Sequence, residues 1–293
     1  MTTLPPGFSL GPMRTDELAT LDAWVQREGW NPGLHDLALA HRVDPEAFIA
    51  LREGDALAGA GTIFRHSPEF GFMGLFIMRP DLRGRGLGRV LWEWRRDALL
   101  ARLASGATLG MDGVFDMVPF YTRGGFRFAH RNLRHEGIAR VGAPETPEAP
   151  GIIALTELAT ADILAFDREH FPCARAAFLL PWLAQAGGVG RALRDAHGAL
   201  IALGFARRCR EGFKFGPVFA RDSSAAAKIL HSLLRATAGQ RVQIDIPEPN
   251  VEGLALARAH GLSEAFGCAR LYLGSDPDLP NARIFGVTSF EFG

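Results

Sequence analysis

The sequence has few cysteines and no long hydrophobic run, and each absence excludes a class of protein. Among 293 residues there are three cysteines, Cys173, Cys209 and Cys268, which are far apart and odd in number, so neither a zinc site nor a disulfide framework is expected. No stretch of about 18 apolar residues appears, and the amino terminus lacks a basic region followed by an apolar one. We therefore expect a soluble protein of the cytoplasm, a reducing compartment, with no membrane partner.

The chain also lacks an excess of charge of either sign. Its 32 basic residues balance 32 acidic ones, so no overall electric field favours nucleic acid as a partner. The nine histidines are scattered without the spacing of metal ligands, and neither a metal nor a Cys-His nucleophile pair is expected. A neutral chain of this kind favours a small ligand.

Apolar residues, by contrast, are abundant. They make up 47% of the chain, which is enough for the cores of two domains. The segment 141–150, VGAPETPEAP, carries three prolines and few side chains that could pack, which is typical of a linker. We therefore expect domains at 1–140 and 151–275, followed by a C-terminal tail at 276–293.

The two halves show the same order of strand and helix patterns. In the first half, strands are predicted at 56–64, 69–78, 108–111 and 126–135, and helices at 87–101 and 117–123. In the second half, strands are predicted at 198–207, 212–220, 241–246 and 264–273, and helices from 223 and at 250–259. Gly125 and Gly261 hold equivalent places, 136 residues apart, which indicates an internal duplication. Chance recurrence of a common order is the alternative.

The loop between the strand 69–78 and the helix 87–101 is rich in glycine and arginine. Its residues are Arg83, Gly84, Arg85, Gly86, Leu87, Gly88 and Arg89. Glycines let the backbone turn tightly and approach a ligand, so N–H groups and the helix amino terminus can face phosphate oxygens. The pattern predicts a pyrophosphate-binding loop. A simple connecting turn remains an alternative, as does another nucleotide enzyme, although the loop lacks the Lys-Ser/Thr ending that nucleotide triphosphatases use.

Two motifs carry a resemblance to a known family. The spacing Arg83-x-x-Gly86-x-Gly88, after an apolar strand and Pro80, resembles the pyrophosphate signature of the GNAT acetyltransferase superfamily. Residues 120–126, FYTRGGF, resemble the part of that fold where a short helix passes the CoA thiol. With EGWNPG at 28–33 and a degenerate second half, the chain is similar to a bacterial two-domain subgroup. The resemblance implies an α/β (α+β) protein of tandem GNAT folds, each a mixed, mostly antiparallel central sheet flanked by helices.

The resemblance also implies an activity and a first set of site residues. The protein would transfer an acetyl group from acetyl-CoA, a co-substrate, to a small-molecule or peptide amine by direct attack in a ternary complex, without a metal. The loop from Arg83 to Arg89 would bind the pyrophosphate, and the strand end at Phe76 and Met78 would bind the pantetheine arm and the thioester. Tyr121 would protonate the CoA thiolate, or else only pack in the core. A non-catalytic CoA sensor is the alternative function.

The base and the acceptor site are less defined. By their order in the chain, Asp112 and Glu69 are the best-placed carboxylates to take the amine proton, and a surface or capping role is the alternative for each. Acceptor candidates follow the first helix, a region that lines the acceptor site in this fold: Glu28, Trp30, Asn31 and Asp36. An aromatic ring and carboxylates could bind a cationic amine there. Trp30 could instead be a core anchor.

The second half departs from the family pattern at its own loop. The segment 220–225, ARDSSA, has no glycine and places Asp222 where pyrophosphate would approach, so a fixed negative charge would repel the phosphates. No tyrosine lies near Ala257, the position that matches Tyr121. We therefore expect only the first half to bind CoA, in a monomer or a homodimer.

Overall fold

The computed structural model describes residues 4–140 and 148–293, so most of the predicted linker 141–150 lies outside the described residues. Its strands are β1 (Phe8–Pro12), β2 (Phe48–Glu53), β3 (Ala56–Ser67), β4 (Phe70–Met78), β5 (Thr108–Gly113), β6 (Arg127–Ile138), β7 (Ile152–Ala154), β8 (Val189–Arg194), β9 (Leu200–Arg208), β10 (Phe213–Ala220), β11 (Arg241–Pro247), β12 (Ser263–Leu273) and β13 (Ile284–Gly286). The α-helices are α1 (Leu18–Arg27), α2 (Asp36–Val43), α3 (Leu87–Arg102), α4 (Val118–Arg123), α5 (Thr160–Arg168), α6 (Ala176–Leu183), α7 (Ser223–Ala236) and α8 (Val251–Ala259).

The predicted elements are present, with ends shifted by a few residues at most. The largest differences are in β3 and β6, which each run three residues beyond their predicted ends. The strands are antiparallel except for the pairs β4–β5 and β10–β11. This confirms the expected fold class of mixed, mostly antiparallel sheets flanked by helices.

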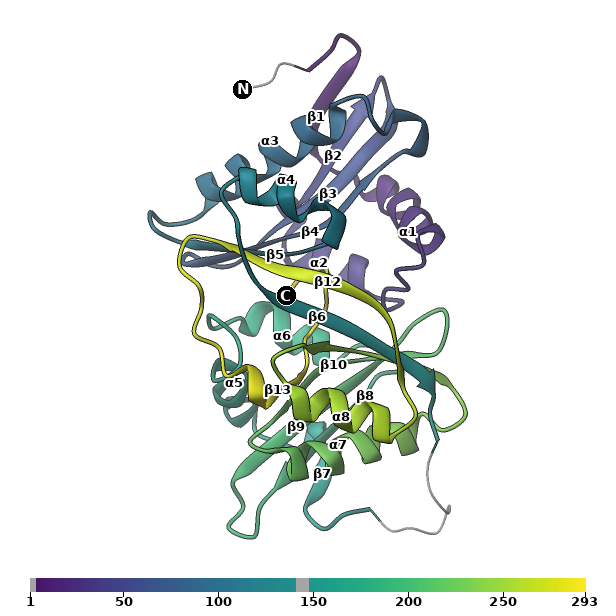
Figure 1. Cartoon of the computed structure of the whole chain (residues 1–293), viewed down its shortest axis with the longest axis vertical. Coiled ribbons are helices and arrows are strands. Elements are labelled where there is room, and N and C mark those ends of the chain that lie inside the picture. Colours follow the sequence, from purple (N-terminus) through teal and green to yellow (C-terminus); the bar gives the residue numbers. More distant parts are fainter. Residues whose placement is uncertain (1–3, 141–147) are drawn as a thin grey trace.

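The two halves exchange one strand each, β6 and β12. Within the described residues the sheet is continuous, in the order β1-β2-β3-β4-β5-β12-β6-β11-β10-β9-β8-β7, with β13 on β10. Thus β12, late in the chain, pairs with β5, while β6 pairs with β11. Figure 1 shows both strands running side by side between the upper and lower halves. The predicted boundary at 141–150 therefore separates the halves in sequence, while each sheet is completed by a strand from the other side of it.

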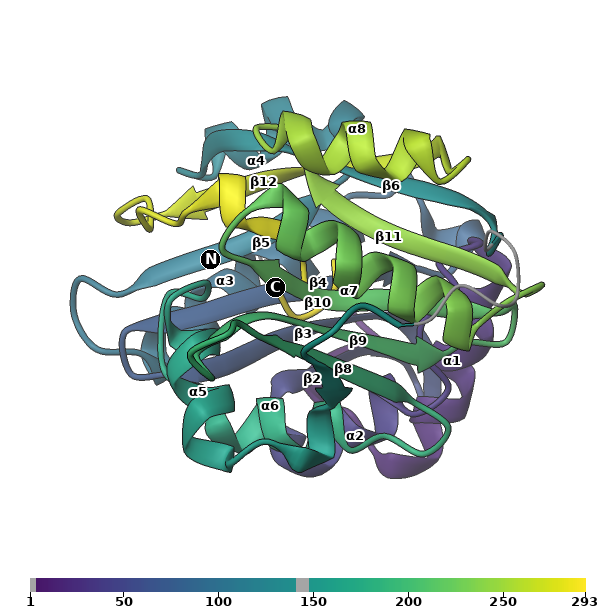
Figure 2. The same cartoon turned by 90° about the horizontal axis from the view of Figure 1, so that it is seen from below.

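The core lies in several clusters, one of them between the halves. Helix α1 packs on β4 and helix α2 on α6, and Figure 2 shows α1, α2, α5 and α6 on the face opposite α7 and α8. Buried rings of both halves meet in this central cluster, including Phe48, Phe64, Phe178, Trp182 and Phe292. Because apolar burial is the main favourable term in folding, this shared cluster joins the halves into one folding unit.

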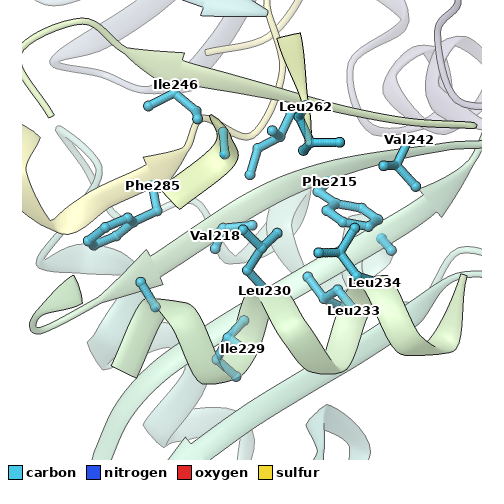
Figure 3. Close-up of a cluster of buried hydrophobic side chains, with 14 of the residues drawn as sticks. Phe215, Val218, Ile229, Leu230, Leu233, Leu234, Val242, Ile246, Leu262 and Phe285 are labelled. Atoms are coloured by element: carbon cyan, nitrogen blue, oxygen red, sulfur yellow. The ribbon is translucent and has the colours of Figure 1, made fainter. Parts of the chain in front are cut away.

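The last ten residues, 284–293, which we call the C-terminal segment, are all buried. Strand β13 pairs with β10, and the Val287 N–H donates to the carbonyl of Asp245 on β11 at 2.9 Å. Figure 3 shows Phe285 in the same cluster as Ile229 and Leu230 of α7. The end of the chain expected as a tail therefore packs within the fold, with Phe285 in the second half and Phe292 in the cluster between the halves.

Candidate active site

A cavity of about 880 Å³ opens in the first half where β4 and β5 separate. These strands pair in parallel from Phe70 with Thr108 to Met73 with Met111, and the pairing ends there. Leu75 has a φ of 50°, and the β3–β4 register shifts beside it, so β4 carries a bulge at this point. The separation leaves the β5 side of Gly74 to Met78 without a strand partner and available to a ligand.

The glycine-rich loop forms one wall of this cavity. Gly84 and Gly86 have φ values of 77° and 82°, which favour glycine, and a side chain on either would meet no atom within 4 Å. No backbone N–H from Gly84 to Gly88 donates a hydrogen bond to another described residue. Gly86 caps α3 without a side-chain acceptor, so the amino terminus of a 16-residue helix stays open. These donors can bind an anion.

The predicted arginines differ in their surroundings. Arg83 donates to the Met78 carbonyl at 3.0 Å and forms an ion pair with Glu28. Arg89 lines the cavity with its guanidinium 5.9 Å from the Phe120 ring. Arg85 is exposed and does not line the cavity, whereas the Leu87 side chain is buried in the core. Among the seven loop residues, the cavity wall thus includes Arg83, Gly84, Gly86, Gly88 and Arg89, together with Phe76 and Met78 of β4.

Tyr121 lies on α4 across the separated strands and lines the cavity with a side chain that is only 3% exposed. Its ring packs near Trp92 and Phe120, and a Cβ on Gly113 would collide with it. The hydroxyl has no hydrogen-bond partner among the described residues. Burial raises the pKa of Tyr121 to about 12, so the phenol stays protonated at neutral pH. The two sequence interpretations, packing and a proton donor, are compatible in this position.

The two carboxylates predicted as bases lie in unlike places. Asp112 lines the cavity, but its oxygens accept from Arg270 at 2.8 and 2.7 Å and from Asn132 at 2.9 Å. Burial raises the pKa of Asp112, and these donors oppose that effect. Glu69 is exposed in the turn before β4, at the end of that strand opposite Met78, and does not line the cavity. Asp112 is thus bound by donors of the fold, and Glu69 lies away from the cavity.

The acceptor candidates also separate. Trp30 is half-buried and lines the cavity, and its carbonyl accepts from Arg134 at 3.2 Å and Lys214 at 3.0 Å. Glu28 lines the cavity in its ion pair with Arg83. Asn31 instead donates to the Glu211 carbonyl at 3.1 Å.

Asp36 likewise lies outside the cavity wall and accepts from Arg207 at 2.9 Å. The partners of Asn31 and Asp36 belong to the second half. These two residues therefore join the halves.

Sequence reasoning missed the part of the wall that the second half supplies. Phe266 and Cys268 of β12 and Phe290 and Glu291 of the C-terminal segment line the cavity, and Arg134 of β6, from the first half, also lines it. The strand exchange brings the residues of β6 and β12 there, and the C-terminal segment reaches the cavity where it crosses Gly74. The pattern Phe290-Glu291-Phe292 has the period of a strand, which was the available signal that this segment packs in the fold.

No cluster of three or more His, Cys, Asp or Glu side chains that could hold a metal ion occurs among residues 4–140 and 148–293. Over the same ranges, none of the helices has the length and apolar character needed to span a bilayer.

Comparison with known proteins defines the class. Residues 18–142 and residues 163–286 each match a family described as Acetyltransferase (GNAT) domain. The chain belongs to the GNAT family, as the sequence motifs indicated, and carries two such domains. It is an acyltransferase, and nothing in these matches points to the non-catalytic alternative.

Three known proteins are similar to this chain over nearly its whole length. Holothin acyltransferase from Pseudoalteromonas sp. (strain SANK 73390) is 25% identical over 285 residues, covering 96% of this chain and 93% of that protein. A candidate acetyltransferase from Pyrococcus horikoshii has a TM-score of 0.83 at 18% identity, covering 100% of this chain and 98% of that one. A tandem GNAT protein from the clavulanic acid biosynthesis pathway has a TM-score of 0.63 at 15% identity, over 92% and 99% of the two chains. The two solved structures show the shared fold.

Proposed function

We propose that the first half binds acetyl-CoA in the cavity between β4 and β5 and that the enzyme acetylates a small amine. One observation carries this proposal: Gly84, Gly86 and Gly88, whose N–H groups are free, line the same cavity as Gly74 to Met78, which have no strand partner on the β5 side. A phosphate group and an extended amide-containing arm need these two kinds of partner side by side. GNAT enzymes in general use acetyl-CoA and act on amines.

The cavity residues fit such a co-substrate. The loop N–H groups would bind the pyrophosphate, with Arg89 adding charge, and Arg83 would hold the loop against Met78 through its bond to that carbonyl. Phe76 and Met78 would contact the pantetheine arm. Acetyl-CoA supplies an activated thioester, and the backbone beyond the β4 bulge would orient its carbonyl.

Tyr121 would donate a proton to the sulfur as the thiol leaves. Its position on the cavity wall, its lack of a hydrogen-bond partner and a pKa of about 12 all support this role, because a donor must be protonated at the working pH.

One relative of the chain is named holothin acyltransferase, and we propose a small molecule as the acceptor of this enzyme. Trp30 remains an acceptor-site residue in this proposal because it lines the cavity. Glu28 has a less direct part, since Arg83 already pairs with its carboxylate. The domains at 1–140 and 151–275, a cytoplasmic location and a monomer or homodimer carry over as parts of the same proposal.

Calorimetric titration with acetyl-CoA tests the proposal, and we expect one site per chain. Gly86→Glu should weaken binding by at least about 10²-fold, because it places a carboxylate at the open helix terminus. Gly106→Glu is the matched control, since Gly106 has a φ of 80° and equally open surroundings but does not line the cavity. Equal affinity in both folded variants would refute the assignment of the loop.

A further inference from the structure

Glu291 is a buried carboxylate without a hydrogen-bond partner. It is only 5% exposed, lies between Phe290 and Phe292 in the C-terminal segment, and lines the cavity. Neither of its carboxylate oxygens accepts a hydrogen bond from another described residue, and Oε2 is fully buried. Buried polar atoms are nearly always paired, so an unpaired carboxylate on a cavity wall indicates that a ligand supplies the donor.

The position of Glu291 agrees with the proposed chemistry. Its backbone crosses β4 at Gly74, where a Cβ would collide with the Glu291 carbonyl oxygen. Gly74 is the first residue beyond the last β4–β5 pair, so the segment crosses at the apex of the separated strands. Tyr121 lines the same cavity from α4. A carboxylate and a phenol thus line the cavity in which the thioester would lie.

Charged neighbours act on Glu291 from several strands but do not bind it. Arg134 of β6 is held by Asp245 at 2.7 Å, and Arg207 of β9 by Asp36 at 2.9 Å. Lys214 of β10 interacts with it electrostatically, as does Cys268 of β12. The Lys214 ammonium donates to the Trp30 carbonyl. The carboxylate is therefore left for a substrate.

Three aromatic rings of both halves belong to the wall of the same cavity. Trp30, Phe266 and Phe290 line it, and Phe266 remains 38% exposed. The Arg134 guanidinium lies 4.8 Å from the centre of the Phe290 ring and 5.7 Å from that of Phe266. Flat apolar walls of this kind favour a flat, unsaturated guest that can stack on them.

We propose that the acceptor is a primary amine on a small aromatic body and that Glu291 accepts its proton; this inference rests on the proposed function. The neutral amine nitrogen, which an ammonium group yields by first losing one proton to solvent, bonds to the thioester carbon, and the carbon–sulfur bond breaks. One proton passes from the nitrogen to the Glu291 carboxylate, and the Tyr121 hydroxyl gives its proton to the sulfur. The products are an amide and the free CoA thiol, and one proton then returns from Glu291 to Tyr121 through solvent.

The test measures CoA thiol release from acetyl-CoA with two probe amines, benzylamine, which is cationic at pH 7, and aniline, which is neutral. Glu291→Gln should lower kcat by about 10²-fold with both amines while acetyl-CoA affinity stays within about 2-fold of wild type. Glu291→Asp should recover part of the rate. Glu252→Gln, an exposed carboxylate change on α8 away from the cavity, is the control and should leave the rate unchanged.

Each other outcome overturns a stated part. Unchanged kcat in Glu291→Gln, or a loss confined to benzylamine, removes the role as base, because a counter-ion alone would affect only the charged amine. If Glu291→Gln does not fold, Glu291→Asp with an unchanged kcat has the same meaning. Wild type that binds acetyl-CoA but acetylates neither probe refutes the aromatic acceptor. Wild type that does not bind acetyl-CoA refutes the proposed function instead.

Discussion

In each half a parallel pair of strands separates, but the space between the strands is an open cavity in the first half and is filled by the chain in the second. In the first half β4 and β5 part after Met73 and enclose a cavity. In the second half β10 and β11 part after Phe215, and the C-terminal segment fills the space through β13 and the bond from Val287 to Asp245. A duplicated fold can therefore keep its topology and lose its site when the chain itself occupies the space.

The helix that follows each separation differs in the same sense. In the first half, the residues between Met78 and Leu87 form the glycine-rich loop. In the second half the connection is shorter, because β10 ends at Ala220 and α7 begins at Ser223. Gly86 caps α3 with no side chain, but the Asp222 carboxylate accepts from the Ala225 N–H at 2.8 Å and caps α7. One helix leaves its donors for a ligand, and the other satisfies them internally.

The strongest test removes the C-terminal segment. Deleting residues 284–293 takes away five buried apolar side chains, Ile284, Phe285, Val287, Phe290 and Phe292. Each stabilises the fold by about 1.5–3 kcal/mol, so the loss is on the order of 10 kcal/mol and comparable to the whole stability of a domain. We expect an insoluble or unfolded chain in thermal unfolding. A folded truncated chain with two acetyl-CoA sites would show instead that the segment only blocks the second separation.

A second test lowers the pH to weaken the packing of the C-terminal segment at His66. His66 holds the Phe292 carbonyl at 2.8 Å, and burial together with the charge of Arg175 lowers its pKa from 6.5 to about 3. The unfolded chain then binds more protons below pH 6.5, so stability falls as the pH drops, by up to about 3 kcal/mol between pH 6.5 and 4. Urea unfolding of wild type and His66→Gln measures this. The free energy of unfolding should fall less in the variant than in wild type as the pH drops. An equal fall in both would show that His66 does not cause the pH dependence.

A third test uses two glycines of the first half. Gly74→Ala should cost about 3 kcal/mol, because its Cβ would collide with the backbone of Glu291 and backbone cannot move aside easily. Gly88→Ala should cost little, because its Cβ would lie 3.5 Å from Met78 and Phe76. Thermal unfolding compares them. Similar melting temperatures would mean that the segment does not fix the apex of the first separation.

A fourth test concerns only the first half, in which the space between the strands is a cavity. Tyr121→Phe should lower kcat by about 10²-fold with little change in acetyl-CoA affinity, because the proton donor is lost while the ring still packs on Trp92. Steady-state kinetics and calorimetry measure the two quantities. An unchanged kcat would leave Tyr121 with its packing role only.

The smallest effect is expected from a substitution in the second half, in which the C-terminal segment fills the space between the strands. Asp222→Ala removes the cap of α7 and should cost about 1 kcal/mol of stability in urea unfolding. It should not create a second acetyl-CoA site, because β13 still fills the space. A stoichiometry of two would mean that the aspartate, and not the C-terminal segment, excludes the ligand.

Local patterns predicted the elements around the site, but they did not predict how the halves combine. The strand 69–78, the loop and the helix 87–101 follow from neighbouring residues, whose spacing sets backbone conformation directly. The pairing of Leu271 with Met111 joins residues 160 positions apart, and nothing in either strand specifies that partner. Asp112 was predicted as a base because its partner could not be foreseen: the strand exchange places Arg270 beside it, and the two form an ion pair. Glu291 was missed because no residue near it in the sequence specifies that the C-terminal segment crosses β4 at Gly74.

The exchanged strands also set the order in which a new chain can fold. While the chain leaves the ribosome, β5 has no neighbour on one edge until residue 273 has been made, although every loop residue of the cavity emerged long before. An unpaired edge of this kind is prone to wrong pairing. The cavity therefore forms after synthesis of nearly the whole chain, and a gene cut at the linker would yield two fragments that each need the other.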